Sequence, residues 1–153
     1  KIVPDHWLKP GTLLEKPGKR VDFVGSPWGW PIVSPAMLAV FEEFAGGDIQ
    51  VLPLKVVDSS GSPVLEDYKV FNVLRCLDHV LDLEHSVTSY HTIGDENVQY
   101  IITPVFYADR IPYNIHFFRF AESMLKLVVS QEFAEAIQNA QLRGFALIET
   151  GSV

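Results

Sequence analysis

The stretch from Ser130 to Gly144 constrains the fold most, because it carries the start and stop signals of a helix in the correct order. Ser130 is a residue type that accepts a backbone N–H at a helix start, and Glu132 lies in the first turn, where the helix dipole favours an anion. Gly144 follows a basic residue and can take the left-handed conformation that ends many helices. Apolar residues recur at i, i+4 and i+7, in Phe133, Ile137 and Ala140. The sequence therefore predicts an amphipathic helix with one buried face.

A second stretch nearer the N-terminus repeats this pattern. Ser34 stands in the place of Ser130, and Pro35 follows at the first helical position, where its missing N–H has no role. Each predicted helix is followed by alternating apolar residues that favour a strand, at 49–51 and at 145–148. We therefore predict two helix-then-strand units. Duplication and the common capping rules both explain their likeness.

The rest of the chain consists of β-prone segments between turn residues. Residues 1–31 form a Pro- and Gly-rich arm that contains one short strand at 21–24, and 89–97 is interpreted as an exposed turn with Gly94 and Asp95 at its tip. Further strands are expected at 49–57 with a bend at Pro53, 68–81, 98–107 with a break at Pro104, 115–121 and 125–129. Within 68–81 the apolar spacing also fits a helix, and residue preference favours the strand. The prediction is an α+β fold with a mostly antiparallel sheet and two main helices.

Length and charge limit the organisation and the partners. The 153 residues, 48% of them hydrophobic, are enough for one core, so a single domain with its core over 32–149 is expected. No apolar run is long enough to span a bilayer, and the one cysteine allows no internal disulfide, so a cytoplasmic protein is expected. The net charge of −7 disfavours nucleic acid and anionic membranes and favours a basic protein partner.

Three residue types of a nucleophilic site lie together at Cys76, Asp78 and His79. Residues adjacent in sequence seldom form such a site, and a buried structural cysteine is the favoured interpretation. Five nearby side chains could also bind a metal ion, although their spacing matches no strong metal-site template. They are His79, Asp82, Glu84, His85 and His91. Trp28 and Trp30 form either a lid over the first helix or a recognition patch.

Segments spread over 22–149 together resemble a bacterial immunity-protein family of polymorphic toxin systems. Residues 68–86 resemble its Y-x-x-x-N-V-x-x-x-x-D-x-x-x-D-x-x-x-S stretch, from Tyr68 through Asp78 and Asp82 to Ser86. Its N-terminal helix resembles Pro31-x-Val33-Ser34. Its C-terminal half resembles Phe118-Arg119, Val129-Ser130-x-x-Phe133, Ile137 and Leu142-x-Gly144-Phe145.

The resemblance implies a cytosolic antidote that binds a toxin encoded beside it, with no catalytic residue, metal or cofactor. We therefore expect an immunity protein that neutralises a cognate toxin by covering its active site or substrate entrance. Acidic and aromatic residues are the expected toxin contacts: Asp78, Asp82, Glu84, Trp28 and Trp30. The same acids could instead solvate a sheet rim or pair with Arg75 or Arg119. A small hydrolase that uses Cys76 and His79 and a regulatory or scaffold module without a toxin partner are the alternatives.

Overall fold

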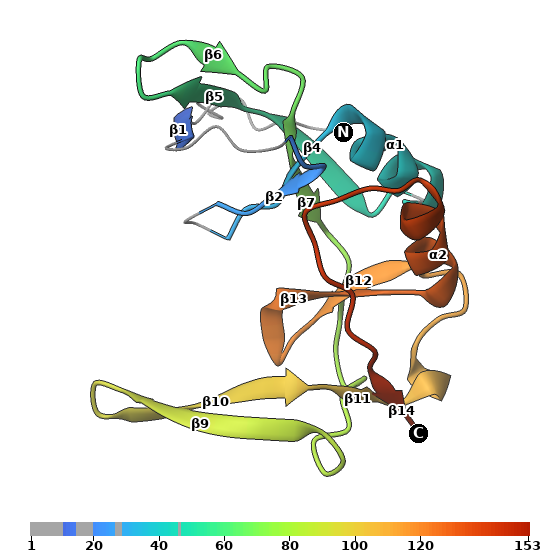
Figure 1. The fold of residues 1–153 in the computed structure, drawn as a ribbon. Helices are drawn as coiled ribbons and strands as arrows, with labels where there is room; N and C mark the ends of the chain where they lie inside the picture. Colours follow the sequence, from blue (N-terminus) through green and yellow to red (C-terminus); the bar gives the residue numbers. More distant parts are fainter. Residues whose placement is uncertain (1–10, 15–19, 27–28, 46) are drawn as a thin grey trace. The chain divides into compact units, whose positions relative to one another are not determined.

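The computed structural model describes residues 11–14, 20–26, 29–45 and 47–153 (Figure 1). Contacts group the chain into two compact units. The first comprises Lys1–Leu74 and Gln131–Ala146, and the second comprises Arg75–Ser130 and Leu147–Val153. The single domain stays a prediction.

The first unit contains a four-stranded antiparallel sheet and both α-helices. The strand order is β2 (Phe23–Val24), β3 (Ile32–Val33), β7 (Lys69–Val73) and β4 (Ile49–Pro53). A second, three-stranded sheet has the order β1 (Gly11–Leu14), β5 (Lys55–Asp58) and β6 (Pro63–Val64), with β1 parallel to β5. The predicted bend near Pro53 is confirmed, because β4 ends there and β5 begins two residues later in another sheet.

Helix α1 (Pro35–Phe44) begins where the sequence predicts. The Ser34 hydroxyl accepts the Met37 N–H at 3.2 Å and donates to Asp22 Oδ1 at 2.7 Å, so the N-cap is hydrogen-bonded to the residue that precedes β2. The aromatic rings of Phe41 and Phe133 then join α1 to α2 (Gln131–Asn139), with centroids 4.7 Å apart. This contact buries the apolar faces that the periodicity predicts.

Helix α2 ends earlier than predicted, and Gly144 does not terminate it. Gln141 has φ +53° and closes the helix. Its N–H donates to the Gln138 carbonyl, and the Leu142 N–H donates to the Ile137 carbonyl, which is the hydrogen-bond pattern of a Schellman motif. The positive φ predicted for Gly144 is present, at +107°, but in the segment that follows the helix.

The strand predicted at 145–148 is absent, because this segment pairs with no other strand of the described chain and is largely exposed. The strand that follows α2 comes later, at β14 (Gly151–Ser152), and pairs in parallel with β11 (Val105–Phe106) in the second unit. The α+β class with mostly antiparallel pairing is confirmed.

The second unit contains three small sheets and one short 3₁₀ turn, η1 (Ala108–Arg110). One sheet has the order β13 (Ser123–Val129), β12 (Phe117–Phe120) and β8 (Cys76–Leu77), with β8 parallel to β12. The strand interpretation of 68–81 is confirmed in part, because β7 and β8 are strands but belong to different sheets, and no strand follows β8 within this range. The core of this unit is the cluster Val80, Leu81, Ile101, Phe106, Phe118 and Phe120.

The exposed turn predicted over 89–97 has its tip at Gly94 and Asp95 as expected, but the turn is much shorter than predicted. The segment belongs to a hairpin of β9 (Val87–Ile93) and β10 (Glu96–Thr103), in which only Gly94 and Asp95 lie in the loop. Its many polar side chains lie on exposed strand faces, so the sequence lacks the alternation that marks a half-buried strand. Within the described ranges, we find no helix that is both long and apolar enough to cross a membrane.

Candidate partner-binding surface

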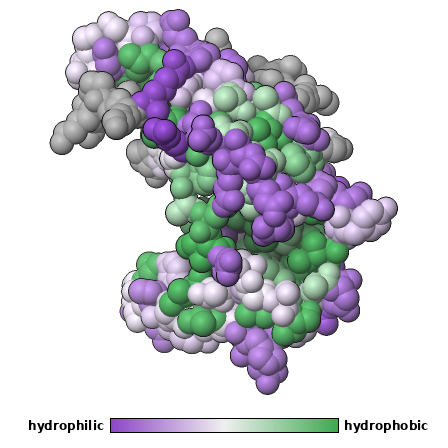
Figure 2. All heavy atoms as spheres, turned by 45° about the vertical axis from the view of Figure 1, so that its right-hand side comes forward, coloured by the Kyte–Doolittle hydropathy of each residue, from purple (hydrophilic) through white to green (hydrophobic). Residues whose placement is uncertain are grey.

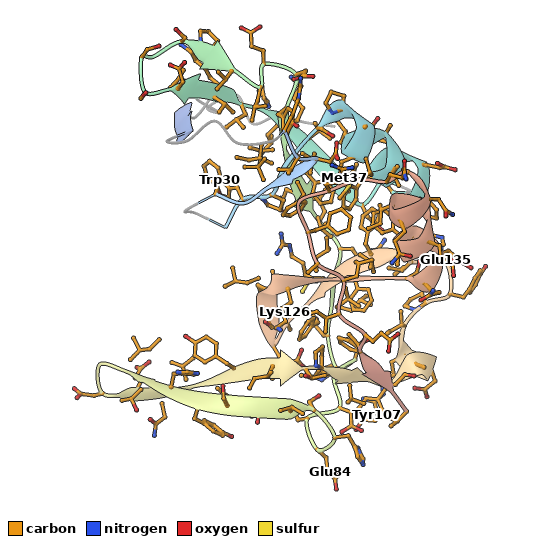
Figure 3. All side chains as sticks on the ribbon, in the orientation of Figure 1. Trp30, Met37, Glu84, Tyr107, Lys126 and Glu135 are labelled. Carbon is orange, nitrogen blue, oxygen red and sulfur yellow. The ribbon has the colours of Figure 1, made fainter. Side chains whose placement is uncertain are left out.

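The predicted contact residues do not form one patch in the structure. Asp78 and Glu84 are exposed in the second unit, and the Glu84 side chain points away from that unit (Figure 3). Trp30 is half-buried in the first unit, where it packs against a core cluster that includes Ile32 and Tyr68. Trp28 lies outside the described residues. Contact by these residues stays a prediction.

Asp82 differs from its two acidic neighbours because it is buried, with 2% of its surface exposed. Its carboxylate accepts the backbone N–H groups of Glu84 at 3.0 Å and His85 at 3.2 Å, and Oδ2 lies 2.7 Å from His85 Nδ1. The Ser86 hydroxyl donates to its carbonyl and accepts the Val105 N–H. The carboxylate therefore holds the turn that presents Glu84.

The pair of Asp82 and His85 is also coupled electrostatically. The hydrogen bond from the His85 ring lowers the pKa of Asp82 below its ordinary value, even though burial acts in the opposite direction. The same hydrogen bond, reinforced by the negative charge of Asp82, raises the pKa of His85. Each ionised form thus favours the other.

Cys76 is exposed, so the prediction of a buried cysteine is wrong. It lies on the short strand β8 at an edge of its sheet, with its sulfur 3.5 Å from the Met124 sulfur. Partial burial and the negative charges of Asp78 and Glu122 raise the pKa of the thiol, which favours the protonated, less nucleophilic form. His79 has φ +59°, and its carbonyl accepts a hydrogen bond from Arg110 at 2.8 Å.

Two further features bear on chemistry. In the part of the chain that the structure describes, no group of three or more His, Cys, Asp or Glu side chains is placed to hold a metal ion. A hollow of about 170 Å³ in the second unit is lined by the side chains of Phe106, Ile115 and Phe118, among others, and its described lining includes no acid, base or cysteine. The lining does include Ser130, whose hydroxyl lies 3.1 Å from the Nδ1 atom of His116.

The largest group of exposed apolar side chains in the second unit lies on the β9–β10 hairpin. These residues are Val87, Tyr90, Ile93, Tyr100 and Ile102, which are between 42% and 67% exposed. Hydrophobic residues reach the surface of this unit on the face drawn in Figure 2. Monomeric proteins seldom expose contiguous apolar surface without a binding role.

Strand register assigns these residues to two faces. Ile93 lies opposite Glu96, His91 opposite Val98 and Ser89 opposite Tyr100, and cross-strand partners share a face. We call this face, with Val87 and Ile102 at its base, the outer face. On the other face, Ile101 is buried in the core and Tyr90 lies opposite Gln99. The outer face is therefore the apolar, solvent-exposed face of the hairpin.

A ring contact orders the middle of the outer face. The rings of His91 and Tyr100 meet edge to face, with centroids 4.9 Å apart. The sequence does not predict this surface, because the polar residues of 89–97 favour a turn. A signal was present, since residues 87–103 contain several large apolar residues and no Lys, Arg or Pro.

A family model described as "Immunity protein family (Imm11)" matches residues 6–152, nearly the whole chain. The chain belongs to the Imm11 immunity protein family. The resemblance indicated by the motifs spread over 22–149 is thereby confirmed. No curated protein matches the chain.

Membership in the Imm11 family gives the chain an immunity-protein role, which in general means binding to a toxin partner. Family membership also favours a non-enzymatic role. It assigns no contact residue.

Proposed function

We propose that this Imm11 protein neutralises a cognate toxin in the cytoplasm by stoichiometric binding, and that the outer face of the β9–β10 hairpin is part of the contact. The observation that carries the proposal is an apolar sheet face, with Tyr100 and Ile102 exposed by 42% and 52%, in a family whose members act as immunity proteins. A few residues carry most of the binding energy at protein interfaces, and tyrosine is among the residue types enriched there.

The charge around this face supports a basic partner. The second unit holds eight Asp and Glu residues against four Lys and Arg residues. Two of the acids, Asp95 and Glu96, lie at the tip of the hairpin, and Glu84 lies before its first strand. A toxin that acts on nucleic acids or nucleotides has a basic active site, and an acidic protein can cover such a site and be steered to it. The toxin is proposed to be the product of a neighbouring gene in a polymorphic toxin system.

The proposal is tested with the toxin domain encoded by the neighbouring gene. The double variant Tyr100→Ala/Ile102→Ala should raise the Kd by about tenfold to a hundredfold and reduce protection of cells that express the toxin. Tyr113→Ala is the matched control, because Tyr113 is 98% exposed in the same unit but lies outside the hairpin. A folded double variant that binds as the wild type does would exclude the outer face.

The hydrolase alternative predicts a different result in the same assay. Cys76→Ser and His79→Ala should leave both the Kd and protection unchanged if the protein acts by binding alone. A thiol-dependent enzyme would lose its activity by orders of magnitude. Because Cys76 is exposed, the serine variant is expected to fold, which its thermal melt checks.

A further inference from the structure

Among the described residues, no strand pairs with β9 along the edge that points away from β10. The hairpin is a two-stranded sheet, and the backbone hydrogen bonds that the described residues make outside regular elements involve none of the residues Val87–Ile93. This edge therefore presents unpaired N–H and C=O groups to the surface (Figure 1).

The hairpin turn identifies which residues present these groups. The loop has two residues, with Gly94 at φ +62°, as expected for glycine at the first central position of a type II′ turn. Ile93 and Glu96 flank the loop and form its hydrogen-bonded pair, and hydrogen-bonded and non-hydrogen-bonded pairs alternate along the ladder. The N–H and C=O groups directed to the free edge of β9 therefore belong to Thr88, Tyr90 and Thr92.

The two edges of the hairpin differ in how well they are shielded from pairing with another strand. Lys126 on β13 donates to the carbonyl of Ile102 on β10 at 3.0 Å (Figure 3), and β10 has an irregular register near this point and ends before Pro104. Lysine, bulges and proline are the devices by which proteins protect an edge strand from pairing. Neither strand itself contains Lys, Arg or Pro, so these three features near the end of β10 are what distinguish the two edges. The edge left open for pairing is thus that of β9.

On the basis of the proposed function, we propose that β9 accepts an extended segment of the toxin as an additional strand. Such strand addition supplies affinity through main-chain hydrogen bonds. Acids bracket the edge, with Glu84 before β9 and Asp95 and Glu96 after it. The complementary segment is an extended one with β-prone residues in its middle and Lys or Arg on both sides.

The charges favour this occupant over a second copy of the chain. An antiparallel pairing of two β9 strands centred on Tyr90 brings Glu96 of one copy toward Glu84 of the other. Bringing these like charges closer is unfavourable, although neither acid lies on the paired strands, and each copy also carries a net charge of −7. A basic partner segment turns the same acids into attractive contacts.

Proline substitutions at one cross-strand pair test the two edges of the hairpin independently. Tyr90 and Gln99 lie opposite each other, and each directs its N–H to its own outer edge. Tyr90→Pro removes a donor from the β9 edge without removing a hairpin hydrogen bond, and Gln99→Pro does the same at the β10 edge. Tyr90→Ala controls for the lost ring. These variants of the full chain are titrated with the toxin domain encoded by the neighbouring gene.

We expect Tyr90→Pro to raise the Kd at least about tenfold above that of Tyr90→Ala, and Gln99→Pro to bind as the wild type does. Amide hydrogen exchange of the wild type provides a second measurement that does not depend on the variants folding. The amides of Thr88, Tyr90 and Thr92 should become protected when the toxin is added, whereas those of Asn97 and Gln99 should not.

Other results would overturn either strand addition, the choice of the toxin as occupant, or the proposed function itself. Equal Kd values for Tyr90→Pro and Tyr90→Ala, or no added protection at β9, would overturn strand addition and leave the proposed function standing. Protection that rises with the concentration of the chain alone would identify a second copy as the occupant. Failure of the wild type to bind the toxin would overturn the proposed function, and strand addition with it.

Discussion

At the scale of single residues, Gly144 shows how one position depends on its surroundings. A Cβ atom at Gly144 would lie 2.2 Å from the Phe23 carbonyl oxygen, and the φ of +107° is itself unfavourable for other residues. The close approach arises because the Arg143 carbonyl accepts the N–H groups of Asp22 and Phe23, and the Arg143 N–H donates to Asp22 Oδ2. Gly144 is therefore required by the contact between two backbone segments of the first unit.

Gly144→Ala should cost about 1 kcal/mol of backbone strain and a further 1–3 kcal/mol, roughly, for the clash. Gly47→Ala is the matched control, since Gly47 has φ +103° and a Cβ atom at this position would have no other atom within 4 Å. We expect Gly47→Ala to lose only the strain. Urea denaturation of both variants measures the difference, and equal losses would contradict the role of the contact.

At the scale of elements, the turn from Asp82 to Ser86 joins the core of the second unit to the hairpin. Val80 and Leu81 before the turn are core residues, and β9 begins directly after it. The buried Asp82 carboxylate accepts hydrogen bonds from two backbone N–H groups and contacts one ring nitrogen in this turn. Asp82, which the sequence predicts to be a surface charge, thus orders the turn at the base of the hairpin.

The pKa shifts of this turn predict how stability depends on pH. The pKa of Asp82 is lowered in the folded state, so its contribution is present above its ordinary value of 3.8 and is lost as pH falls through the lowered value. The pKa of His85 is raised, so its contribution is complete below 6.5 and is lost as pH rises through the raised value. The pair stabilises most between these two limits.

His85→Asn should therefore lower the Tm more at about pH 6 than at about pH 8. Thermal melts of the wild type and the variant across this range provide the measurement. Asp82→Asn removes the partner of the imidazole and should abolish the same difference between the two pH values, in addition to lowering the Tm. A constant difference between wild type and His85→Asn at all pH values would contradict the pairing.

At the scale of the whole molecule, net charge acts on association with a partner. Asp78 and Glu84 are exposed acids of the second unit, and Glu43 and Glu66 are exposed acids of the first. Reversal of either pair changes the net charge by the same amount. Any difference between the two double variants therefore reports where the partner binds.

We expect Asp78→Lys/Glu84→Lys to slow association with the toxin and to flatten its dependence on salt, because screening acts over roughly 8–10 Å at physiological ionic strength. Glu43→Lys/Glu66→Lys should change the association rate less. Stopped-flow measurements at low and high salt compare the two variants. Equal effects would show that only the total charge matters and would remove Asp78 and Glu84 from the contact.

Local physical chemistry in the sequence determined the elements whose signals lie close together along the chain. Ser34 and Pro35 predicted the start of α1, the spacing of Phe133 and Ile137 predicted the buried face of α2, and Pro53 predicted the boundary of β4. These signals depend on backbone capping and on side-chain periodicity within one or two turns. The motifs spread over 22–149, taken together, also indicated the immunity-protein family that the family model confirms.

Only the tertiary structure decided the features that depend on residues far apart in the chain. Helix α2 is closed by Gln141 and not by the predicted Gly144. The residues after the helix hydrogen-bond to Asp22 and Phe23 through Arg143. Asp82 became a buried hydrogen-bond acceptor, whereas Cys76 became exposed at a sheet edge. The sequence does not show which edge of the hairpin is free, because an edge is defined by the absence of a neighbouring strand, here among the described residues. Whether a strand has a neighbour is decided by pairing between distant segments and not by the local preference of each segment.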